Sequence, residues 1–414
     1  MNKYLYDLKN INDISKNHDS KRVPISGHLR EKRIGEYPYY GATKIMDYID
    51  DFIFDGTYVL ISEDGTVADK KGRPILQLTN GKFWVSNHAH VLQGEDNIET
   101  KFIFFALQSI KIRPFLTGSV QLKLSQSNLN RIKISYPKSR NIRKKIVNIL
   151  NCLEEKISLI AKNNQTLEAI SKGLFKSWFI DFDPVLAKAE GRSTGLPNEI
   201  SDLFPDSFED SKLGEIPKDW FVTSLDELNE ITMGQSPPGS TYNKSRKGLP
   251  FYQGKTDFGF RHPNRRVFCS EPKRFADESS TLLSVRAPVG SINVANESCC
   301  IGRGLASIKS KEGQHSFTYY LLNGIQLIFD SYNSEGTVFG AINRNDLSSI
   351  SVINPPSNIR EVFNNFASKI DKKISLGIEE INLLSSLRDT ILPPLISGEL
   401  RIPHAEKMIE DAEI

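Results

Sequence analysis

The sequence predicts an α/β (α+β) protein. Two similar mixed domains are separated by two long helices, which form an antiparallel, coiled-coil-like pair with pseudo-two-fold symmetry. Three observations predict this fold class: a repeat of long period, two matching apolar stripes, and strand-like runs upstream of each stripe. The length of 414 residues is enough for two or three domains with their own hydrophobic cores.

The repeat has a spacing of about 217 residues, which is too long for a solenoid and predicts two copies of one module. Three pairs of segments align: Gly118-Ser-Val with Gly336-Thr-Val, Asn141-Ile-Arg with Asn358-Ile-Arg, and Glu155-Lys-Ile-Ser-Leu with Lys372-Lys-Ile-Ser-Leu.

An apolar stripe with steps of three and four residues follows in each copy, as expected for one face of a long helix. The first stripe contains Ile142, Ile146, Ile149, Leu153, Ile157, Ile160, Leu167, Ile170, Leu174 and Trp178. The second contains Ile359, Phe363, Phe366, Ile370, Ile374, Ile381, Leu384, Leu387, Ile391 and Leu395. Pro393-Pro394 predicts that the second helix ends near Leu392, because proline lacks the backbone N–H.

We expect the two stripes to bury each other; the alternative is that each helix packs only on its own domain. Asn164 stands where the first stripe expects an apolar residue, so it is a candidate for fixing the register of the pair. The predicted interface consists of Ile146, Leu153, Ile160, Asn164, Leu167, Ile370, Ile374, Ile381 and Leu384.

Both copies begin with strand-like runs, such as Tyr58–Ser62 and Thr281–Val285, and with helical segments at residues 101–110 and 317–330. The predicted organisation is a first globular domain (1–140), a central spacer helix (141–182), an acidic connector rich in Pro and Gly (183–216), a second globular domain (217–356), a C-terminal spacer helix (357–398) and a tail (399–414).

The net charge of +3 hides an uneven distribution. Residues 131–145 hold seven Lys and Arg and no acid. Residues 244–274 interleave aromatic side chains with nine basic ones: Lys244, Arg246, Lys247, Lys255, Arg261, Arg265, Arg266, Lys273 and Arg274. Basic segments with aromatic residues favour nucleic acid as a partner, although runs of charge are also typical of solvated faces.

Several classes of protein are disfavoured. No apolar run approaches the ~20 residues of a membrane span, and the N-terminus lacks the apolar core of a signal peptide. The four cysteines show no Cys-x-x-Cys spacing, which disfavours a zinc site and a disulfide framework. We therefore expect a cytoplasmic protein without a membrane or metal partner.

Motifs for catalysis are weak or missing. The sequence has no phosphate-binding Gly-x-x-x-x-Gly-Lys-Ser/Thr segment. Asn354-Pro-Pro-Ser resembles the motif that holds a flipped adenine in amino-methyltransferases, but Ser357 replaces the stacking aromatic residue. A loop between a strand and the long helix explains this segment better.

Two possible metal sites are also weak. Pro205-Asp206 with Asp210-Ser-Lys212 resembles a nuclease carboxylate set, but it lies in the connector, where no strands are expected to fix its geometry. His88 and His90 share one face of a predicted strand without a third ligand nearby, so a structural or DNA-contacting role is favoured.

Polar and aromatic loops rich in glycine remain, and they differ between the two copies. Gln, Asn and Arg can pair with base edges, carboxylates can accept from cytosine, and basic residues bind phosphate. The candidate DNA-binding residues of the first copy are Tyr40, Thr43, Lys44, Glu63, Asp64, Asn87 and His88. Those of the second are Gln235, Ser236, Tyr242, Gln253, Lys255, Asp257, Arg261, Arg265, Arg266, Arg286 and Arg303.

Over nearly its whole length the chain resembles the DNA-specificity (S) subunit of type I restriction-modification systems. The segments that carry the resemblance are Gly173-Leu-Phe-Lys-Ser-Trp-Phe-Ile-Asp-Phe-Asp-Pro184, Leu213-Gly-Glu-Ile-Pro-Lys-Asp-Trp220, Gly234-Gln-Ser-Pro-Pro, Ser284-Val-Arg-Ala-Pro-Val-Gly290 and Leu395-Ile-Ser-Gly-Glu-Leu400. One departure is that the first copy lacks a start like that at residues 216–220.

The resemblance implies that both globular domains are target recognition domains, each reading half of a bipartite site in double-stranded DNA. It implies a non-catalytic subunit, with no cofactor of its own, in the cytoplasm of a bacterium or archaeon. Two methyltransferase (M) subunits would bind S-adenosylmethionine, and restriction (R) motor-nuclease subunits would use ATP and Mg²⁺. The alternatives are a specificity subunit of a type II-like methyltransferase-nuclease system, or a stand-alone DNA methyltransferase or nuclease.

Overall fold

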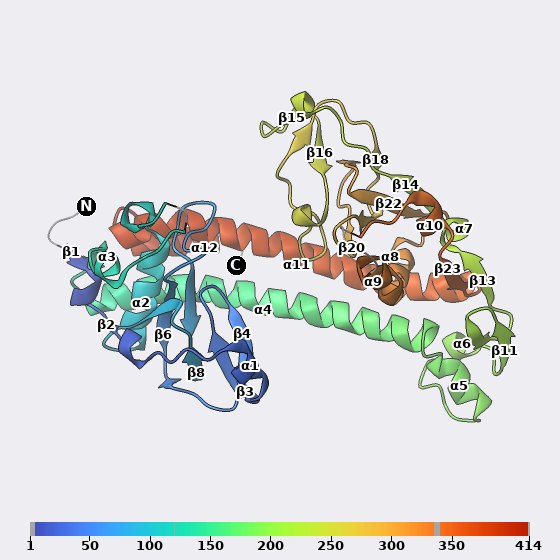
Figure 1. Cartoon of the computed structure of the whole chain (residues 1–414), viewed down its shortest axis with the longest axis horizontal. Coiled ribbons are helices and arrows are strands. Elements are labelled where there is room, and N and C mark those ends of the chain that lie inside the picture. Colours follow the sequence, from blue (N-terminus) through green and yellow to red (C-terminus); the bar gives the residue numbers. More distant parts are fainter. Residues whose placement is uncertain (1–4, 120, 335–339, 413–414) are drawn as a thin grey trace. The chain divides into compact units, whose positions relative to one another are not determined.

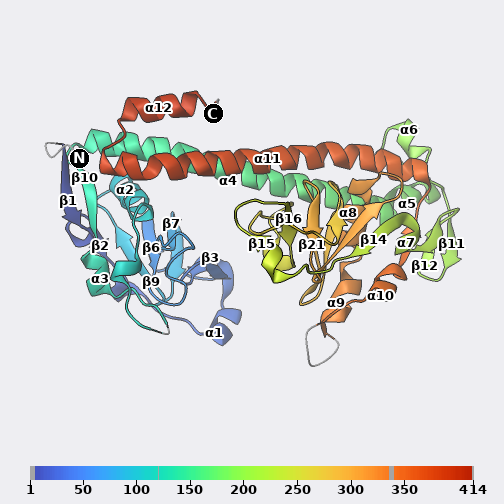
Figure 2. The ribbon, with the colours of Figure 1, turned by 90° about the horizontal axis from the view of Figure 1, so that it is seen from above.

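The computed structural model describes residues 5–119, 121–334 and 340–412, and its ribbon is shown in Figures 1 and 2. The chain forms two compact units, of which unit 1 consists of residues 1–159 and 381–414 and unit 2 of residues 160–380. Each unit contains one globular domain and part of each long helix. The predicted boundaries between domains and spacer helices therefore stay predictions, and residues 336–338 of the aligned repeat lie outside the described residues.

Strands of unit 1 form three sheets within the described residues. They are β1 (Tyr6–Asn10), β2 (Lys16–Asn17), β3 (Ile34–Tyr40), β4 (Ile45–Ile49), β5 (Phe54–Asp55), β6 (Tyr58–Ser62), β7 (Leu76–Thr79), β8 (Lys82–Val85), β9 (Ala89–Gln93) and β10 (Lys133–Pro137). The sheet orders are β2-β9-β6-β7, β4-β3-β8-β5 and β1-β10. Only β3 and β8 pair in parallel among these described strands.

Short helices complete the domain of unit 1. They are η1 (Ile11–Asp13), η2 (Asp19–Lys21), α1 (Gly27–Glu31), α2 (Asn97–Gln108), η3 (Arg113–Phe115), α3 (Gln126–Asn130) and α12 (Ile402–Glu410). The helix predicted at residues 101–110 is confirmed as part of α2, which packs against β6, β7 and β9. Strand β6 is buried along its whole length because α2 contacts it while Phe83 and Val85 of the second sheet join its core cluster.

Strands of unit 2 repeat this arrangement. They are β13 (Phe221–Ser224), β14 (Asn229–Met233), β15 (Tyr242–Asn243), β16 (Leu249–Tyr252), β17 (Phe268–Cys269), β18 (Phe275–Ala276), β19 (Thr281–Val285), β20 (Val289–Val294), β21 (Cys299–Ile301), β22 (Leu305–Ser310) and β23 (Ser351–Asn354). The sheet orders are β14-β22-β19-β20, β15-β17-β16-β21-β18 and β13-β23.

Matching topology confirms that the two domains are copies of one module. Strand β19 takes the place of β6, the parallel pair β16 and β21 takes that of β3 and β8, and β13-β23 takes that of β1-β10. The remaining helices of the second copy are α7 (Leu225–Leu228), η4 (Gly239–Thr241), η5 (Lys255–Asp257), α8 (His315–Gly324), α9 (Gln326–Ser334) and α10 (Arg344–Ser348). The prediction of a single helix at residues 317–330 is wrong, because the helix is interrupted at Ile325, between α8 and α9.

Both long helices are confirmed, as α4 (Arg140–Phe179) and α11 (Ser357–Ser397). In unit 2 they run antiparallel, because Asn164 contacts Ile374 while the later residues Phe175 and Phe179 pack on the earlier Phe363. Phe175 also packs on Phe317 of the domain, so α4 touches both the other helix and the globular domain. The alternative of helices that pack only on their own domains is therefore wrong for this unit.

Residues of the predicted helix interface differ in burial. Ile146, Leu153, Asn164, Ile374 and Leu384 are buried, whereas Ile160, Leu167, Ile370 and Ile381 are half-buried. Two further stripe residues, Ile170 and Phe366, are 48% and 44% exposed. In α4 the next buried positions after Asn164 are Glu168 and Ser171, and Tyr319 of α8 donates its hydroxyl to Glu168.

Asn164 lies opposite a glycine of α11. Its side-chain amide donates to the carbonyl of Ile374 at 3.3 Å. A Cβ atom at Gly377 would lie 2.5 Å from Asn164 Oδ1, so the helices approach closely because residue 377 has no side chain. This local fit supports the predicted role of Asn164 in register.

The predicted end of the second helix near Leu392 is wrong, because α11 continues through Pro393 and Pro394 to Ser397. A proline in a helix interior costs about 3 kcal/mol. Leu395 and Ile396 are 0% and 3% exposed, and fully burying two such side chains stabilises by about 1.5–3 kcal/mol each. The last turn therefore forms in spite of the prolines.

The connector contains folded elements: α5 (Asp183–Ala189), α6 (Asn198–Ser201), β11 (Phe208–Ser211) and β12 (Gly214–Pro217). Val185, Phe204 and Ile216 belong to the main core cluster of unit 2. The expectation that no strand fixes Asp210 is wrong, since β11 and β12 pair there. The Asn354-Pro-Pro-Ser segment joins β23 to α11, as predicted. In the part of the chain that the structure describes, no helix is long and apolar enough to cross a membrane.

Candidate nucleic-acid interface

The turn between β3 and β4 carries the first candidate residues. The amide of Gly41 donates to the carbonyl of Lys44 at 2.9 Å, which leaves Thr43 and Lys44 exposed at the tip. Tyr40 is half-buried edge-on against Phe83. Thr43 and Lys44 are therefore accessible to a partner, while Tyr40 anchors the turn to the core.

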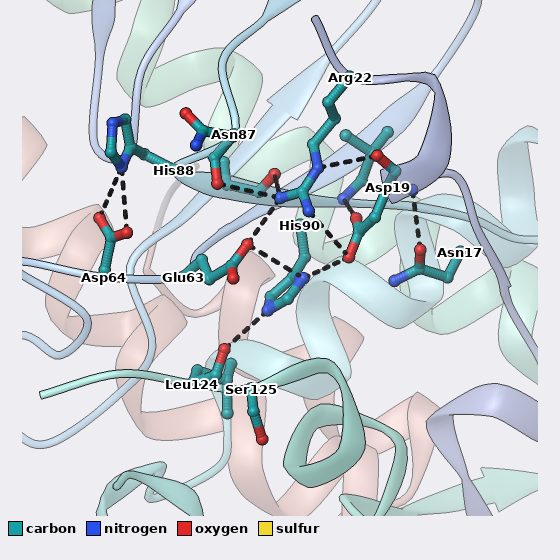
Figure 3. Close-up of polar contacts among 12 residues, drawn as sticks. Asn17, Asp19, Arg22, Glu63, Asp64, Asn87, His88, His90, Leu124 and Ser125 are labelled. Carbon is teal, nitrogen blue, oxygen red and sulfur yellow. Dashed lines mark hydrogen bonds and ion pairs between the residues drawn. The ribbon is translucent and has the colours of Figure 1, made fainter. Parts of the chain in front are cut away.

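Two further loops of unit 1 meet side by side (Figure 3). The amide of Glu63 donates to the carbonyl of His88 at 2.9 Å, and His88 Nδ1 lies 2.9 Å from Asp64 Oδ1. Asn87 and His88 are exposed, whereas Asp64 is only partly so. The structure thus brings four of the predicted residues into one polar group.

Arg22, which the sequence did not single out, joins the two loops by hydrogen bonds to both of them (Figure 3). Its guanidinium donates to Glu63 at 2.7 Å and to the carbonyl oxygens of Ala89 and Asn87 at 2.8 and 3.2 Å. Lys123 lies 3.1 Å from the other oxygen of Glu63. Burial alone would raise the pKa of Glu63, but Arg22, His90 and Lys123 hold it below its ordinary value. We therefore assign Glu63 to organising the loops and not to reading bases.

His90 is buried at the centre of the group. Its Nδ1 lies 2.5 Å from Asp19 and its Nε2 2.7 Å from the carbonyl of Leu124, so both ring nitrogens are occupied. Burial opposes ionisation of Asp19, yet the contact with His90 and the amide of Val91 hold the pKa of Asp19 below its ordinary value. A structural or DNA-contacting role is predicted for the pair His88 and His90; these contacts support the structural role for His90, whereas His88 is exposed. No group of three or more His, Cys, Asp or Glu side chains that could hold a metal ion occurs in residues 5–119, 121–334 and 340–412.

In unit 2 the Gln235 loop packs tightly on the turn that holds Arg303. A Cβ atom at Gly234 would lie 2.2 Å from the carbonyl oxygen of Gly302, so glycine permits the approach. The amide of Arg303 donates to Ser236 Oγ at 3.3 Å, and Gln235 and Arg303 are both exposed. Tyr242 donates its hydroxyl to the carbonyl of Pro237 at 2.8 Å.

The chain matches a family model described as type I restriction modification DNA specificity domain, at residues 5–169 and again at 217–385. The chain belongs to the family of type I restriction-modification specificity subunits. Both matches begin near the start of one repeated module and extend into the following long helix.

Named specificity subunits are similar to it. One is a Methanocaldococcus jannaschii protein named provisionally as the specificity subunit of type I restriction enzyme MjaX, 31% identical over 347 residues, 82% of this chain and 76% of that protein. The HindI specificity subunit of Haemophilus influenzae is 25% identical over 336 residues, 67% of this chain and 71% of that protein. The crystal structure of the M. genitalium S subunit shares the fold, with a TM-score of 0.60, 17% identity and coverage of 96% and 97% of the two chains.

Two residues predicted to read DNA in this specificity subunit are buried. Asp257 is 4% exposed, accepts from the amide of Gln253 at 2.7 Å and pairs with Arg266. Arg261 is 1% exposed, and its guanidinium donates to Asp371 at 2.7 Å. Neither side chain offers surface to a nucleic acid, so we correct both assignments; nothing in a basic run marks which of its members is turned inward.

The other candidates of unit 2 lie at the surface. Gln253, Lys255, Arg265, Arg266 and Arg286 are exposed, although Arg265 is paired with Glu297. Of the nine basic residues in the range 244–274, Arg261 alone is buried and eight are exposed, of which Arg265 and Arg266 are paired with Glu297 and Asp257. Their contacts with DNA stay predictions.

Proposed function

We propose that the chain reads a bipartite site in double-stranded DNA, with one half-site for each recognition domain. The observation that carries this proposal is the duplication: two domains of one topology present different exposed residues, Thr43, Lys44 and Asn87 in the first and Gln235, Gln253 and Arg303 in the second. One scaffold with two sets of side chains suits two independent readings, because sequence is read by the groups that reach base edges.

The subunit carries no catalytic activity and binds no cofactor of its own. It docks two methyltransferase subunits, which bind S-adenosylmethionine, and restriction subunits, which use ATP and Mg²⁺. Supporting this division, the sequence has no phosphate-binding glycine loop, and both ring nitrogens of His90 are occupied within the protein.

Exchanging one domain tests the proposal. Residues 217–356 end at the junction between β23 and α11, so they can be replaced by the corresponding domain of a relative with another specificity. We expect one half of the methylated sequence to change and the other to stay the same, measured by methylation-sensitive sequencing of a host that expresses the partner subunits. The reciprocal exchange of residues 1–140 is the matched control and should change the other half. A single exchange that altered both halves would contradict the proposal.

A further inference from the structure

Arg261 joins the globular domain of unit 2 to the long helix α11. One guanidinium nitrogen donates to Asp371 of α11 at 2.7 Å and another to the hydroxyl of Tyr320 at 3.3 Å. Tyr320 itself donates to the same oxygen of Asp371 at 2.8 Å. The three side chains form a closed polar group in which Arg261 is 1% exposed.

The same guanidinium is connected to α4 indirectly, by way of the side chain of Tyr319. Its carbon lies 4.1 Å from the centroid of the Tyr319 ring, within the range of a cation–π interaction. The hydroxyl of Tyr319 donates to Glu168 of α4 at 3.1 Å. The group around Arg261 therefore contacts both helices of this unit.

His262 adds a second attachment to α11. Its Nε2 lies 2.8 Å from Ser375 Oγ, and its Nδ1 lies 2.9 Å from the carbonyl of Val294. Burial lowers the pKa of His262, so the ring is neutral at neutral pH. Nδ1 then donates to the carbonyl of Val294, while Nε2 lies against the hydroxyl of Ser375, which is itself within hydrogen-bond distance of the Asp371 carbonyl. Two adjacent residues thus hold one loop to one helix.

The loop held in this way also carries residues expected to face DNA. The amide of Asn264 donates to the carbonyl of Asp257 at 2.7 Å, and the Asp257 carboxylate accepts from the amide of Gln253 and pairs with Arg266. A continuous series of contacts thus runs from Asp371 through residues 257–264 to the exposed Gln253 and Arg266. We call residues 253–266 the reading loop.

A buried ion pair is a poor way to gain stability, because desolvation offsets much of the Coulomb attraction and apolar packing often does as well. The planar guanidinium is instead directional, since its donors fix the position and angle of their acceptors. Apolar packing is less directional, so it constrains the angle between the domain and the helix less. Arg261 is therefore better suited to fixing the orientation of the domain on α11 than to stabilising the folded state.

We propose that Arg261 is a positioning residue that fixes the orientation of the reading loop on α11 and thereby limits the spacer lengths at which the second half-site is accepted. This inference rests on the proposed bipartite function. Arg261 acts through Asp371, Tyr319 and Tyr320 and does not touch DNA.

The test uses the full chain assembled with its methyltransferase partners. Duplexes that carry both half-sites, with the natural spacer or one changed by a single base pair, compete for methylation. In Arg261→Met, we expect preference for the natural spacer to fall about tenfold, the smallest effect of losing a charge-assisted hydrogen bond. Both half-site sequences should stay unchanged. Arg261→Lys keeps the positive charge but lacks the planar guanidinium. Its preference for the natural spacer should lie between those of the unmodified chain and Arg261→Met.

Arg265→Met is the matched control, since it removes an exposed arginine from the same loop. It should weaken methylation equally at every spacer. Asp371→Asn should reproduce the loss of spacer preference, and the double variant with Arg261→Met should lose no more than either change alone, because both break one contact. If Arg261→Met does not fold, as judged by circular dichroism, Arg261→Lys and Asp371→Asn decide the question.

Unchanged spacer preference in folded Arg261 and Asp371 variants would overturn the inference, even with weaker overall methylation. Failure of the unmodified complex to require both half-sites would instead overturn the proposed function, so the two failures are distinguishable.

Discussion

Arg143 and Arg360 occupy equivalent positions in the two repeats, in the first turn of each long helix, yet their acidic partners differ in exposure. Arg143 donates to both oxygens of Glu99 at 2.8 and 2.9 Å, and the Glu99 side chain is 5% exposed. Arg360 donates to Glu312 at 3.1 Å, and the Glu312 side chain is 48% exposed.

What the two sites share is a backbone contact. Arg143 also donates to the carbonyl of Pro137 at 2.6 Å, and Arg360 to that of Pro355 at 3.0 Å. The common task of the arginines is thus to join strand, loop and helix, whereas the burial of the carboxylate depends on the surrounding domain. The two ion pairs therefore need not contribute equally to the stability of their domains.

The largest expected effect is a difference in stability between variants that neutralise Glu99 and Glu312. Glu99→Gln leaves Arg143 buried without a counter-charge, and breaking such a pair costs about 3–5 kcal/mol. Glu312→Gln is the matched control and should cost less although Arg360 is also buried, because water reaches the half-exposed Glu312 and Arg360 keeps its hydrogen bonds to Gln314 and to the carbonyl of Pro355. Hydrogen exchange of peptides from α2 and α8, read by mass spectrometry, measures both losses. Equal losses at the two sites would refute the comparison.

A second effect concerns how each domain is joined to α11. In unit 2 the group around Arg261 is buried, whereas in unit 1 Lys71 and Arg73 reach Asp389 at 2.5 and 3.1 Å and Lys71 is 62% exposed. Asp389→Asn should cost about 2 kcal/mol at neutral pH, as expected for hydrogen bonds to a charged group. Lys71→Gln, which removes the exposed partner, should cost less than about 1 kcal/mol.

The dependence of this effect on pH has a definite sign. Burial alone would raise the pKa of Asp389, but Lys71, Arg388 and Arg73 hold it far below the ordinary value of 3.8. The carboxylate therefore stabilises the folded state above about pH 4, and this contribution is lost as the pH falls through the lower folded value. Exchange of residues 69–73, corrected for the intrinsic rate, should show the difference between Asp389→Asn and the unmodified chain shrinking below about pH 4. A difference that stays constant would contradict this account.

The sequence predicts repeated features better than individual contacts. The aligned Asn-Ile-Arg segments placed Arg143 and Arg360 at equivalent junctions, and the apolar periodicity predicted both long helices, because these signals are local and occur twice. The burial of Arg261 depends on Asp371, which lies 110 residues later, and Arg22 is recognised only when Glu63 and the carbonyl of Ala89 meet around it. Such contacts follow from tertiary packing and leave no mark in local sequence.

The smallest effect compares the helices α2 and α8, whose first turns are capped in different ways. Asp96 is the N-cap residue of α2, and its side chain accepts from the amide of Glu99 at 2.9 Å. The N-cap residue Gln314 makes no side-chain cap in α8, and Asn364 of α11 accepts instead from the amides of Ser316 and Phe317 at 3.1 and 3.3 Å.

Removing either cap should cost about 1 kcal/mol, the usual value for an N-cap. Asp96→Ala should speed exchange in the first turn of α2 alone, and Asn364→Ala in the first turn of α8 alone. The two should differ in their response to pH. The hydrogen bonds from Arg140 and from the amide of Glu99 hold the pKa of Asp96 below 3.8, so part of its contribution is present above that value and is lost in acid. Asn364 does not titrate, and its contribution should not change over the same range. Parallel pH profiles for the two variants would show that the charge of Asp96 adds nothing to its cap, and the two caps would then differ only in where the capping oxygen comes from.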